Sequence, residues 1–234
     1  MPCLAELHSH TSVSDGRPTP EEVVIAAARL GLSAIAVSDH NTFRGSAIAV
    51  KAARDMELGV HVIPANEVRT SRGDVLVLCP SLPGDEPVAG LDPAELRDWS
   101  EERACIMVAA HPFHPGRHGV GLYLLRHYGL FDGVEAWNAR GLPIFNMVAE
   151  RFALSRGMPA TSGSDAHVLS ELGRAPTLIK AEDCRPEYVV EAVRRGLCAP
   201  TRAMISPRAA VEAVLWSLER RLRPLLARRS GPTL

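Results

Sequence analysis

Histidines and acidic residues occur in this sequence in short clusters, each of which follows an apolar run. Imidazole and carboxylate groups that converge in one place can bind zinc, manganese or iron, whereas calcium prefers oxygen ligands throughout. Carboxylates that face one another repel unless a cation lies between them, so their convergence itself indicates bound metal. Nine residues are candidate ligands on this basis: His8, His10, Asp15, His40, Glu67, Asp74, His111, Asp165 and His167.

Nine ligands are too many for one tetrahedral ion, and they could fill two or three sites. Such a centre activates water near neutral pH and holds the oxygens of a phosphoryl group during in-line displacement. Hydrolysis of a phosphate ester, with water bound by the metals as the nucleophile, is therefore the favoured reaction. Taken singly, each residue could instead be an ordinary hydrogen-bonding or turn residue, so the prediction depends on the clusters coinciding.

The elements that must position these residues alternate between short aliphatic runs and helical patterns, which is typical of βαβ units. In α/β barrels the reactive groups lie at the carboxyl ends of the strands, which is where the clusters fall here. We therefore expect an α/β barrel of about seven strands over residues 1–202. Residues 203–234 are expected to form a helical extension, in which apolar positions alternate with arginines such as Arg220 and Arg221.

One connection departs from this alternation. Between Glu67 and the apolar run 75–78 lie too few residues for the crossover that joins parallel strands, so we expect an antiparallel hairpin. The hairpin brings Asp74 to the same end of the barrel as Glu67. Asp74 is then either a ligand or an ordinary turn residue after Arg72-Gly73.

Composition restricts the partners. With 26 basic and 27 acidic residues the formal net charge is -1, so no overall field favours nucleic acid or an anionic membrane. No apolar run approaches the roughly 20 residues of a membrane span, and the first residues do not resemble a secretion signal. The five scattered cysteines contain no CxxC pair, which favours reduced thiols and a cytoplasmic protein.

The polar clusters form five motifs along the chain. They are His8-Ser9-His10-Thr11 with Ser14-Asp15-Gly16, Ser38-Asp39-His40-Asn41-Thr42, Asn66-Glu67-Val68, Ala110-His111-Pro112-Phe113 and Gly163-Ser164-Asp165-Ala166-His167. In these motifs the sequence resembles the polymerase and histidinol phosphatase (PHP) family. The resemblance implies a distorted seven-stranded, TIM-like (β/α)7 barrel with up to three metal ions at its carboxyl mouth.

The resemblance also assigns the ligands to three ions. The first would be held by His8, His10, Glu67 and Asp165. Glu67 would bridge to a second ion shared with Asp74 and His111, and the third would be held by Asp15, His40 and His167. Many relatives carry histidine where Asp74 stands, which makes the second site more anionic here or removes one ligand.

Other residues are expected to support the metals or the substrate. Asp39 is expected to fix a neighbouring imidazole, because ligating histidines usually donate their other N–H to a carboxylate or carbonyl. The resemblance places Glu135 beneath the metals. Guanidinium groups suit phosphate, so Arg17, Arg117 and Arg44 are candidate substrate ligands, and His114 is a candidate acid for the leaving group. The arginines could equally be solvated loop charges, and His114 could be a cap or surface residue.

Three functions remain open. The favoured one is a metal-dependent phosphatase that acts on small phosphomonoesters with two or three Mn, Zn or Fe ions. The second is a phosphodiesterase or nuclease, although the short segment between the Glu67 and His111 motifs lacks the helical insertion that nucleotide-cleaving relatives often carry. The third is a noncatalytic metal-binding PHP module. The C-terminal helix could pack on the barrel or join two subunits into a homo-oligomer.

Overall fold

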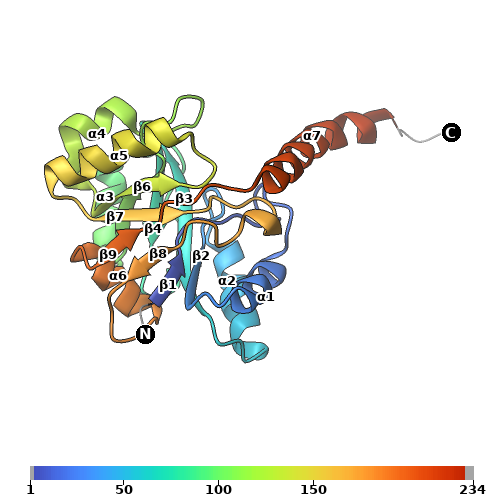
Figure 1. Ribbon diagram of the computed structural model, residues 1–234, viewed down its shortest axis with the longest axis horizontal. Coiled ribbons are helices and arrows are strands. Elements are labelled where there is room, and N and C mark those ends of the chain that lie inside the picture. Colours follow the sequence, from blue (N-terminus) through green and yellow to red (C-terminus); the bar gives the residue numbers. More distant parts are fainter. Residues whose placement is uncertain (1–2, 230–234) are drawn as a thin grey trace.

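The computed structural model describes residues 3–229, with side chains as far as residue 222. One curled sheet, with helices on its outer side, forms a nearly closed α/β barrel (Figure 1). The strands are β1 (Cys3–Glu6), β2 (Ala34–Val37), β3 (His61–Thr70), β4 (Gly73–Leu78), β5 (Ile106–Ala109), β6 (Gly133–Asn138), β7 (Ala160–Gly163), β8 (Thr177–Ile179) and β9 (Cys198–Pro200). The α-helices are α1 (Pro20–Arg29), α2 (Arg44–Asp55), α3 (Pro93–Glu102), α4 (Gly121–His127), α5 (Pro143–Arg156), α6 (Pro186–Arg194) and α7 (Pro207–Arg229).

Local sequence signals set where two of the helices begin. Thr19 and Glu22 form a capping box at the start of α1, and Asp92 and Glu95 form one at the start of α3. Each helix also has proline in its first turn, where the missing N–H costs nothing. Both helices therefore begin directly after their capping residues.

The strand order explains which polar clusters meet. Strands β1, β2 and β3 are parallel, and so are β5, β6 and β7. Between them β3 and β4 form an antiparallel hairpin in which Arg69 pairs with Asp74, and β4 is antiparallel to β5. The predicted hairpin is therefore confirmed, and Asp74 lies at the same end of the barrel as Glu67.

The sheet contains nine strands where the sequence predicted about seven. At the carboxyl end, β1 and β7 meet directly through a bridge between Ser9 and Ala166, and the Asp165 N–H donates to the His8 carbonyl at 2.8 Å. Farther down, the short strand β8 pairs with β1 and β9 pairs with β8, and the Ser162 N–H donates to the Thr177 hydroxyl at 2.8 Å. The mouth is thus a ring of seven strands, and the two extra strands fill the opposite end of the gap.

The cysteines depart from the prediction. Disulfides join Cys3 to Cys184 and Cys79 to Cys105, and only Cys198 is a free thiol. The expectation of reduced thiols is therefore wrong for four of the five. The partners of the first disulfide lie 181 residues apart, so their proximity depends on barrel closure, which spacing along the chain does not reveal.

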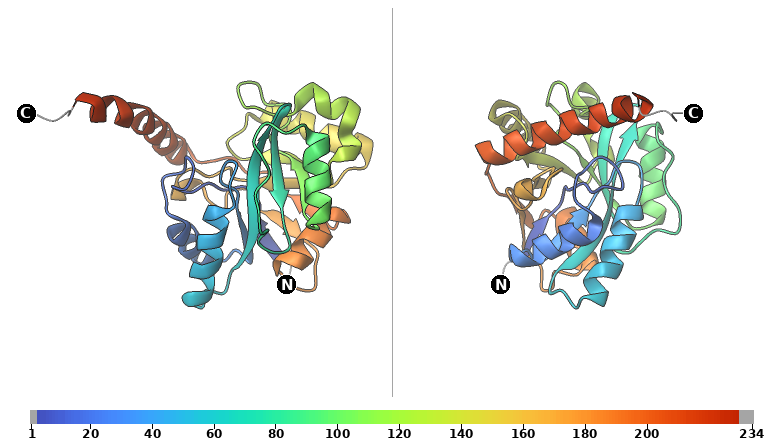
Figure 2. Two further views of the ribbon diagram at one scale, coloured as in Figure 1. Left: turned by 180° about the vertical axis from the view of Figure 1, so that it is seen from behind. Right: turned by 90° about the vertical axis from the view of Figure 1, so that its right-hand side faces the viewer.

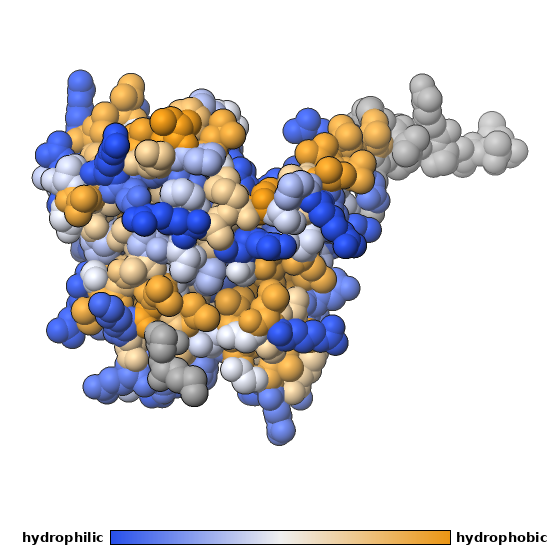
Figure 3. Space-filling view, in the orientation of Figure 1, coloured by the Kyte–Doolittle hydropathy of each residue, from blue (hydrophilic) through white to orange (hydrophobic). Residues whose placement is uncertain are grey.

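The C-terminal helix α7 starts beside the mouth and projects away from the barrel (Figures 1 and 2). Hydrophobic side chains gather along its exposed part (Figure 3), among them Val211, Leu215, Leu218 and Leu222. Within residues 3–229, no helix is both long and apolar enough to cross a bilayer.

Candidate metal centre

His8 and His10 follow β1 and extend into the barrel. Alternate residues of an extended segment share one face, so both imidazoles enter the interior together. Both side chains are completely buried, and their Nε2 atoms lie 3.2 Å apart. The two histidines therefore form the floor of the candidate centre.

Glu67, on β3, faces imidazoles from several strand ends. Its Oε1 lies 3.0 Å from His111 Nε2. Its Oε2 lies 3.2 Å from His10 Nε2 and 3.1 Å from His40 Nδ1. One carboxylate thus turns its two oxygens toward different histidines, which is the arrangement of a carboxylate that bridges two cations.

The remaining candidate ligands lie around His8, His10 and Glu67. Oδ1 of Asp165 lies 3.4 Å from His10 Nε2. Oδ1 of Asp15 lies 3.2 Å from His167 Nε2 and 3.5 Å from His40 Nε2. The structure thus brings eight of the nine predicted ligands into three overlapping groups, in which each residue offers one ligand atom within 4.8 Å of the others. The groups are His10, Asp15, His40 and His167; His8, His10 and Asp165; and His8, Glu67 and His111.

Two of these residues have a backbone conformation that side chains rarely adopt. His111 has φ 29° and Asp165 has φ 52°. Non-glycine residues at positive φ are uncommon, and they concentrate at functional sites where the surrounding structure holds them in place. The turns after β5 and β7 therefore hold a local strain that directs these ligands into the mouth.

Charges in the centre strongly affect one another. Burial alone would lower the pKa of His8, but the carboxylates of Glu135, Asp165 and Glu67 outweigh it and hold this pKa well above its usual value. A similar balance raises the pKa of His10 to about 10. Burial would raise the pKa values of Glu67 and Asp165, yet the neighbouring cationic groups hold both well below the usual range. The site therefore favours positive charge beside ionised carboxylates, and a divalent cation would meet the same requirement.

Buried ligand atoms support the same conclusion. Nδ1 of His10 and Nδ1 of His111 have no hydrogen-bond partner among the described residues. Oδ1 of Asp15 and Nδ1 of His40 lie close to oppositely charged groups but form no well-aligned hydrogen bond with them. Buried polar atoms are normally paired, because leaving them unpaired costs free energy. Imidazole nitrogen and carboxylate oxygen are ligands of zinc, manganese and iron. The residues of the three groups therefore fit divalent metal ions.

Glu135 lies beneath the histidines, on β6. Its Oε1 accepts from His8 Nδ1 at 2.9 Å. Its Oε2 accepts from the backbone N–H of His111 at 2.8 Å and from the Asn138 amide at 3.1 Å. The carboxylate thus fixes the ring of one candidate ligand and the backbone of another.

Asp39 has a different role from the predicted one. Its carboxylate accepts from the Thr11 N–H at 2.8 Å and the Thr11 hydroxyl at 2.6 Å, and also from the Ser14 hydroxyl. Among the described residues, Asp39 forms no hydrogen bond or ion pair with an imidazole. Asp39 therefore holds the loop that carries Asp15, and the prediction that it fixes a histidine is wrong because two hydroxyls and a backbone donor satisfy its oxygens first.

Asp74 lies in the same cavity as Glu67 and His111, but it belongs to none of the three groups. Both of its oxygens bind the Arg69 guanidinium across the hairpin. Burial and the Glu67 carboxylate raise the pKa of Asp74, although Arg69 opposes them. Arg69 therefore competes with any cation for this carboxylate.

This competition gives a test of Asp74 as a ligand. We expect Arg69→Gln to raise the affinity for Mn²⁺ severalfold, because the change frees the Asp74 oxygens and removes a positive charge from the cavity. Calorimetric titration of chelator-treated protein measures the affinity. Arg54→Gln, on the exposed surface of α2, is the control and should leave it unchanged. An unchanged or weaker affinity in Arg69→Gln would assign Asp74 a purely structural role.

Arginines line the cavity, but of the three predicted substrate ligands only Arg117 is among them. Arg117 lines it and pairs with Asp165. Arg17 instead pairs with Glu212 at 3.5 Å, and Arg44 is an exposed residue at the start of α2, so neither lines the cavity. His114 donates its Nδ1–H to the Pro115 carbonyl at 2.8 Å and likewise lies outside the lining, whereas His118 belongs to it.

Sequence reasoning missed several residues of the centre. Arg69, Arg140 and Arg220 also line the cavity. Glu6 accepts from the Ser164 N–H at 2.8 Å and so ties β1 to the loop of Asp165; burial raises its pKa to about 7. Glu6 lies two residues before His8 and Arg140 follows the end of β6, so the strand-end rule could have found both. No local signal marks Arg220.

Comparisons with known proteins agree with the geometry. The model of the PHP domain matches residues 6–110, and the model described as PHP-associated matches residues 143–198. The uncharacterized protein MJ1587 of Methanocaldococcus jannaschii is 32% identical over 147 residues, which are 58% of this chain and 81% of that protein. The 5'-3' exoribonuclease Rnm of Escherichia coli is 37% identical over 67 residues, which are 29% of this chain and 23% of the exoribonuclease.

A solved structure shows the same fold. It is a two-domain protein from Bacteroides vulgatus that contains a predicted PHP-like metal-dependent phosphoesterase. The TM-score is 0.71 at 20% identity, over 87% of this chain and 65% of that chain. The two family models together contain the strand-end motifs from His8 to His167 except His111, and the fold brings these residues into the three ligand groups. The chain therefore belongs to the PHP family.

Proposed function

We propose that this chain is a metal-dependent phosphoesterase and that its substrate is a small phosphomonoester. The observation that carries the proposal is the position of Glu67, whose two oxygens face His111 on one side and His10 and His40 on the other. Two or three divalent ions held around this carboxylate would lower the pKa of water and neutralise phosphoryl oxygens. The intact set of ligand groups argues against a noncatalytic module.

The chain's own residues provide the rest of the chemistry. Arg117 and Arg140 contact Asp165 from the rim, where a guanidinium can donate two parallel hydrogen bonds to phosphate oxygens. His118 lines the same cavity and can donate a proton to the departing oxygen. Glu135 keeps the His8 ring fixed while charge develops at phosphorus.

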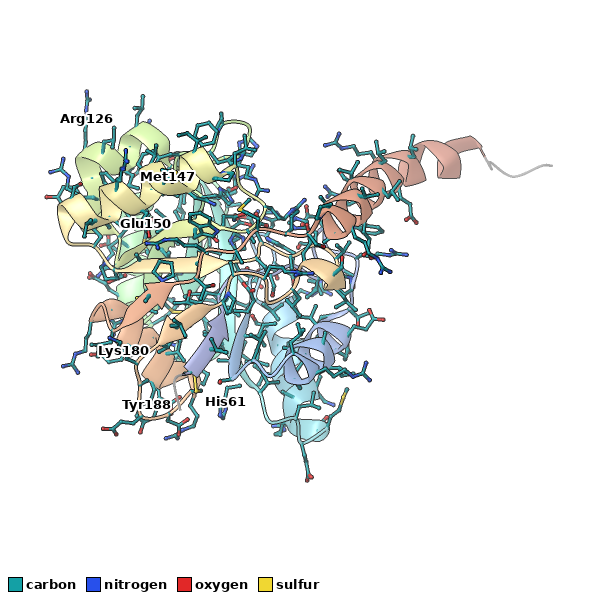
Figure 4. The ribbon with its side chains drawn as sticks, viewed as in Figure 1. His61, Arg126, Met147, Glu150, Lys180 and Tyr188 are labelled. Carbon is teal, nitrogen blue, oxygen red and sulfur yellow. A yellow bond between two sulfur atoms is a disulfide. The ribbon has the colours of Figure 1, made fainter. Side chains whose placement is uncertain are left out.

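The size of the cavity favours a compact substrate. The site cavity has a volume of about 320 Å³, near the lower end for small-molecule sites. A larger cavity of about 780 Å³ lies between β8 and α6, near Lys180 and Tyr188 (Figure 4). None of the three ligand groups lies there, because β8 runs antiparallel to β1 and ends at the opposite end of the barrel. The exoribonuclease relative makes a nuclease the second candidate function.

A substrate panel tests the proposal. Chelator-treated protein, reloaded separately with Mn²⁺, Zn²⁺ or Fe²⁺, is assayed on p-nitrophenyl phosphate, bis-p-nitrophenyl phosphate, mononucleotides and a short labelled RNA. We expect activity on monoesters that disappears on chelation and returns with metal. His8→Ala should abolish it, whereas His61→Ala, at the outer start of β3 (Figure 4), should not.

Faster cleavage of the diester or the RNA would favour the nuclease. Turnover of none of these compounds with any of the metals would refute a phosphoesterase. Bound metal without turnover would then support the noncatalytic module.

A further inference from the structure

The C-terminal helix α7 contributes to the metal centre although it lies outside both matched family regions, residues 6–110 and 143–198. Its first half is docked at three points. Trp216 donates its indole N–H to the Asp15 carbonyl at 2.8 Å, and Glu212 accepts from the Ser170 hydroxyl at 2.7 Å. Ala213 and Trp216 also pack on Val168, and all three are buried. The helix is therefore fixed to the loops that carry Asp15 and His167.

Arg220 lies one turn beyond Trp216. Residues four apart share a helix face, so the anchored indole directs the guanidinium toward the same loop. Its Nη2 lies 3.3 Å from Asp15 Oδ2, and the side chain lines the site cavity while 44% exposed. An arginine of the helical extension that the sequence predicts therefore enters the mouth of the barrel.

The two oxygens of the Asp15 carboxylate face different partners. Oδ1 faces the imidazoles of His10, His40 and His167, whereas Oδ2 faces Arg220. A guanidinium has five N–H donors, so it can hold Asp15 and still donate to a second anion. Arg220 therefore stands where an anion in the cavity would meet both the ligand group around Asp15 and a donor from α7.

Charge in the cavity supports an anionic occupant. Arg69, Arg117, Arg140 and Arg220 line it from four separate parts of the chain. The acids that line it are Asp15, Glu67, Asp74 and Asp165, so the two sets of formal charges cancel. Each divalent ion bound by the ligand groups would then make the cavity positive. Such a cavity attracts phosphate oxygens. Arg220, on α7, is the most exposed of its four arginines.

We infer that α7 is part of the substrate site and that Arg220 binds phosphate oxygens of the substrate. The inference rests on the proposed phosphoesterase function for its kinetic test, but phosphate binding can be measured without turnover. Arg220 then acts in binding rather than in the chemical step. Its loss is expected to affect KM more than kcat.

The test compares Arg220→Ala with Arg221→Ala in the Mn²⁺-loaded full chain. Arg221 is the adjacent exposed arginine and is not among the described residues that line the cavity, so it is a matched control. We expect Arg220→Ala to raise the Kd for inorganic phosphate and the KM for p-nitrophenyl phosphate about tenfold, as for loss of one charge-assisted hydrogen bond. kcat and the melting temperature should stay close to wild type, and Arg220→Lys should recover part of the loss.

Each contrary outcome is distinct. An unchanged Kd for phosphate in Arg220→Ala, or an equal loss in Arg221→Ala, would overturn the inference. A fall in kcat and Mn²⁺ content with unchanged KM would overturn it as well, by assigning Arg220 to the support of Asp15. If the wild-type protein binds phosphate through Arg220 but hydrolyses no ester, the proposed function fails while the inference about α7 stands.

Discussion

Replacing Glu67 with glutamine is expected to lower metal-dependent turnover roughly a thousandfold, equivalent to about 4 kcal/mol of lost transition-state stabilisation. The carboxylate faces His111 with one oxygen and His10 and His40 with the other. A glutamine keeps the size of the side chain, but it loses the negative charge and presents N–H donors on one side. One isosteric change therefore weakens the group of His8, Glu67 and His111 and also removes the carboxylate that His10 and His40 face.

The measurement is kcat on p-nitrophenyl phosphate together with the metal content of protein purified without chelator. Glu150→Gln is the matched control, because Glu150 lies on α5 and pairs with Arg202 on the surface (Figure 4). Thermal unfolding shows whether the variant is folded. A folded Glu67→Gln protein with normal metal content and normal kcat would contradict the bridging role.

Glu135→Gln is expected to weaken metal affinity about 10–100-fold, the usual effect of removing a partner that orients a ligand. Both Glu135 oxygens accept hydrogen bonds, one from His8 and the other from His111 and Asn138. An amide offers one acceptor and one donor group, so neither orientation of glutamine satisfies both sides. The His8 ring and the His111 backbone then lose their fixed positions.

Because Glu135 acts through His8 and His111, the primary readout is Mn²⁺ affinity by calorimetry, with kcat at saturating metal as the second. Partial recovery of kcat at high metal concentration would distinguish a positioning residue from a ligand. Glu187→Gln, an exposed acid beside Arg185, is the control. Unaltered affinity in Glu135→Gln would show that the histidines are oriented by the rest of the fold.

Much of the centre follows from the sequence because parallel strands have a common carboxyl end. This rule places His8, His40, Glu67 and Asp165 together without knowledge of distances. The short connection after Glu67 predicts the hairpin, and its register then places Asp74 at the mouth. These predictions need only strand direction, which local patterns and loop lengths determine.

The rest depends on how distant segments are packed. Arg17 and Arg117 look equivalent in the sequence, since both follow strand-end motifs, yet only Arg117 lines the cavity. Arg17 pairs with Glu212, on a helix whose direction no pattern in the barrel specifies. The Asp39 carboxylate accepts hydrogen bonds from hydroxyls of a neighbouring loop, and Cys3 forms a disulfide with Cys184. In each case the partner is determined by which segments the fold brings close together, and local sequence patterns do not show this.

The junction between β1 and β7 also affects folding. His8 and His10 lie on one side of this junction and Asp165 on the other, and a few backbone hydrogen bonds near Ser9 and Ala166 join the two sides. An ion ligated by all three would fasten the first segment of the barrel to its seventh strand. Metal loading and ring closure would then be thermodynamically linked, so a bound cation would couple the two ends of the barrel in folding.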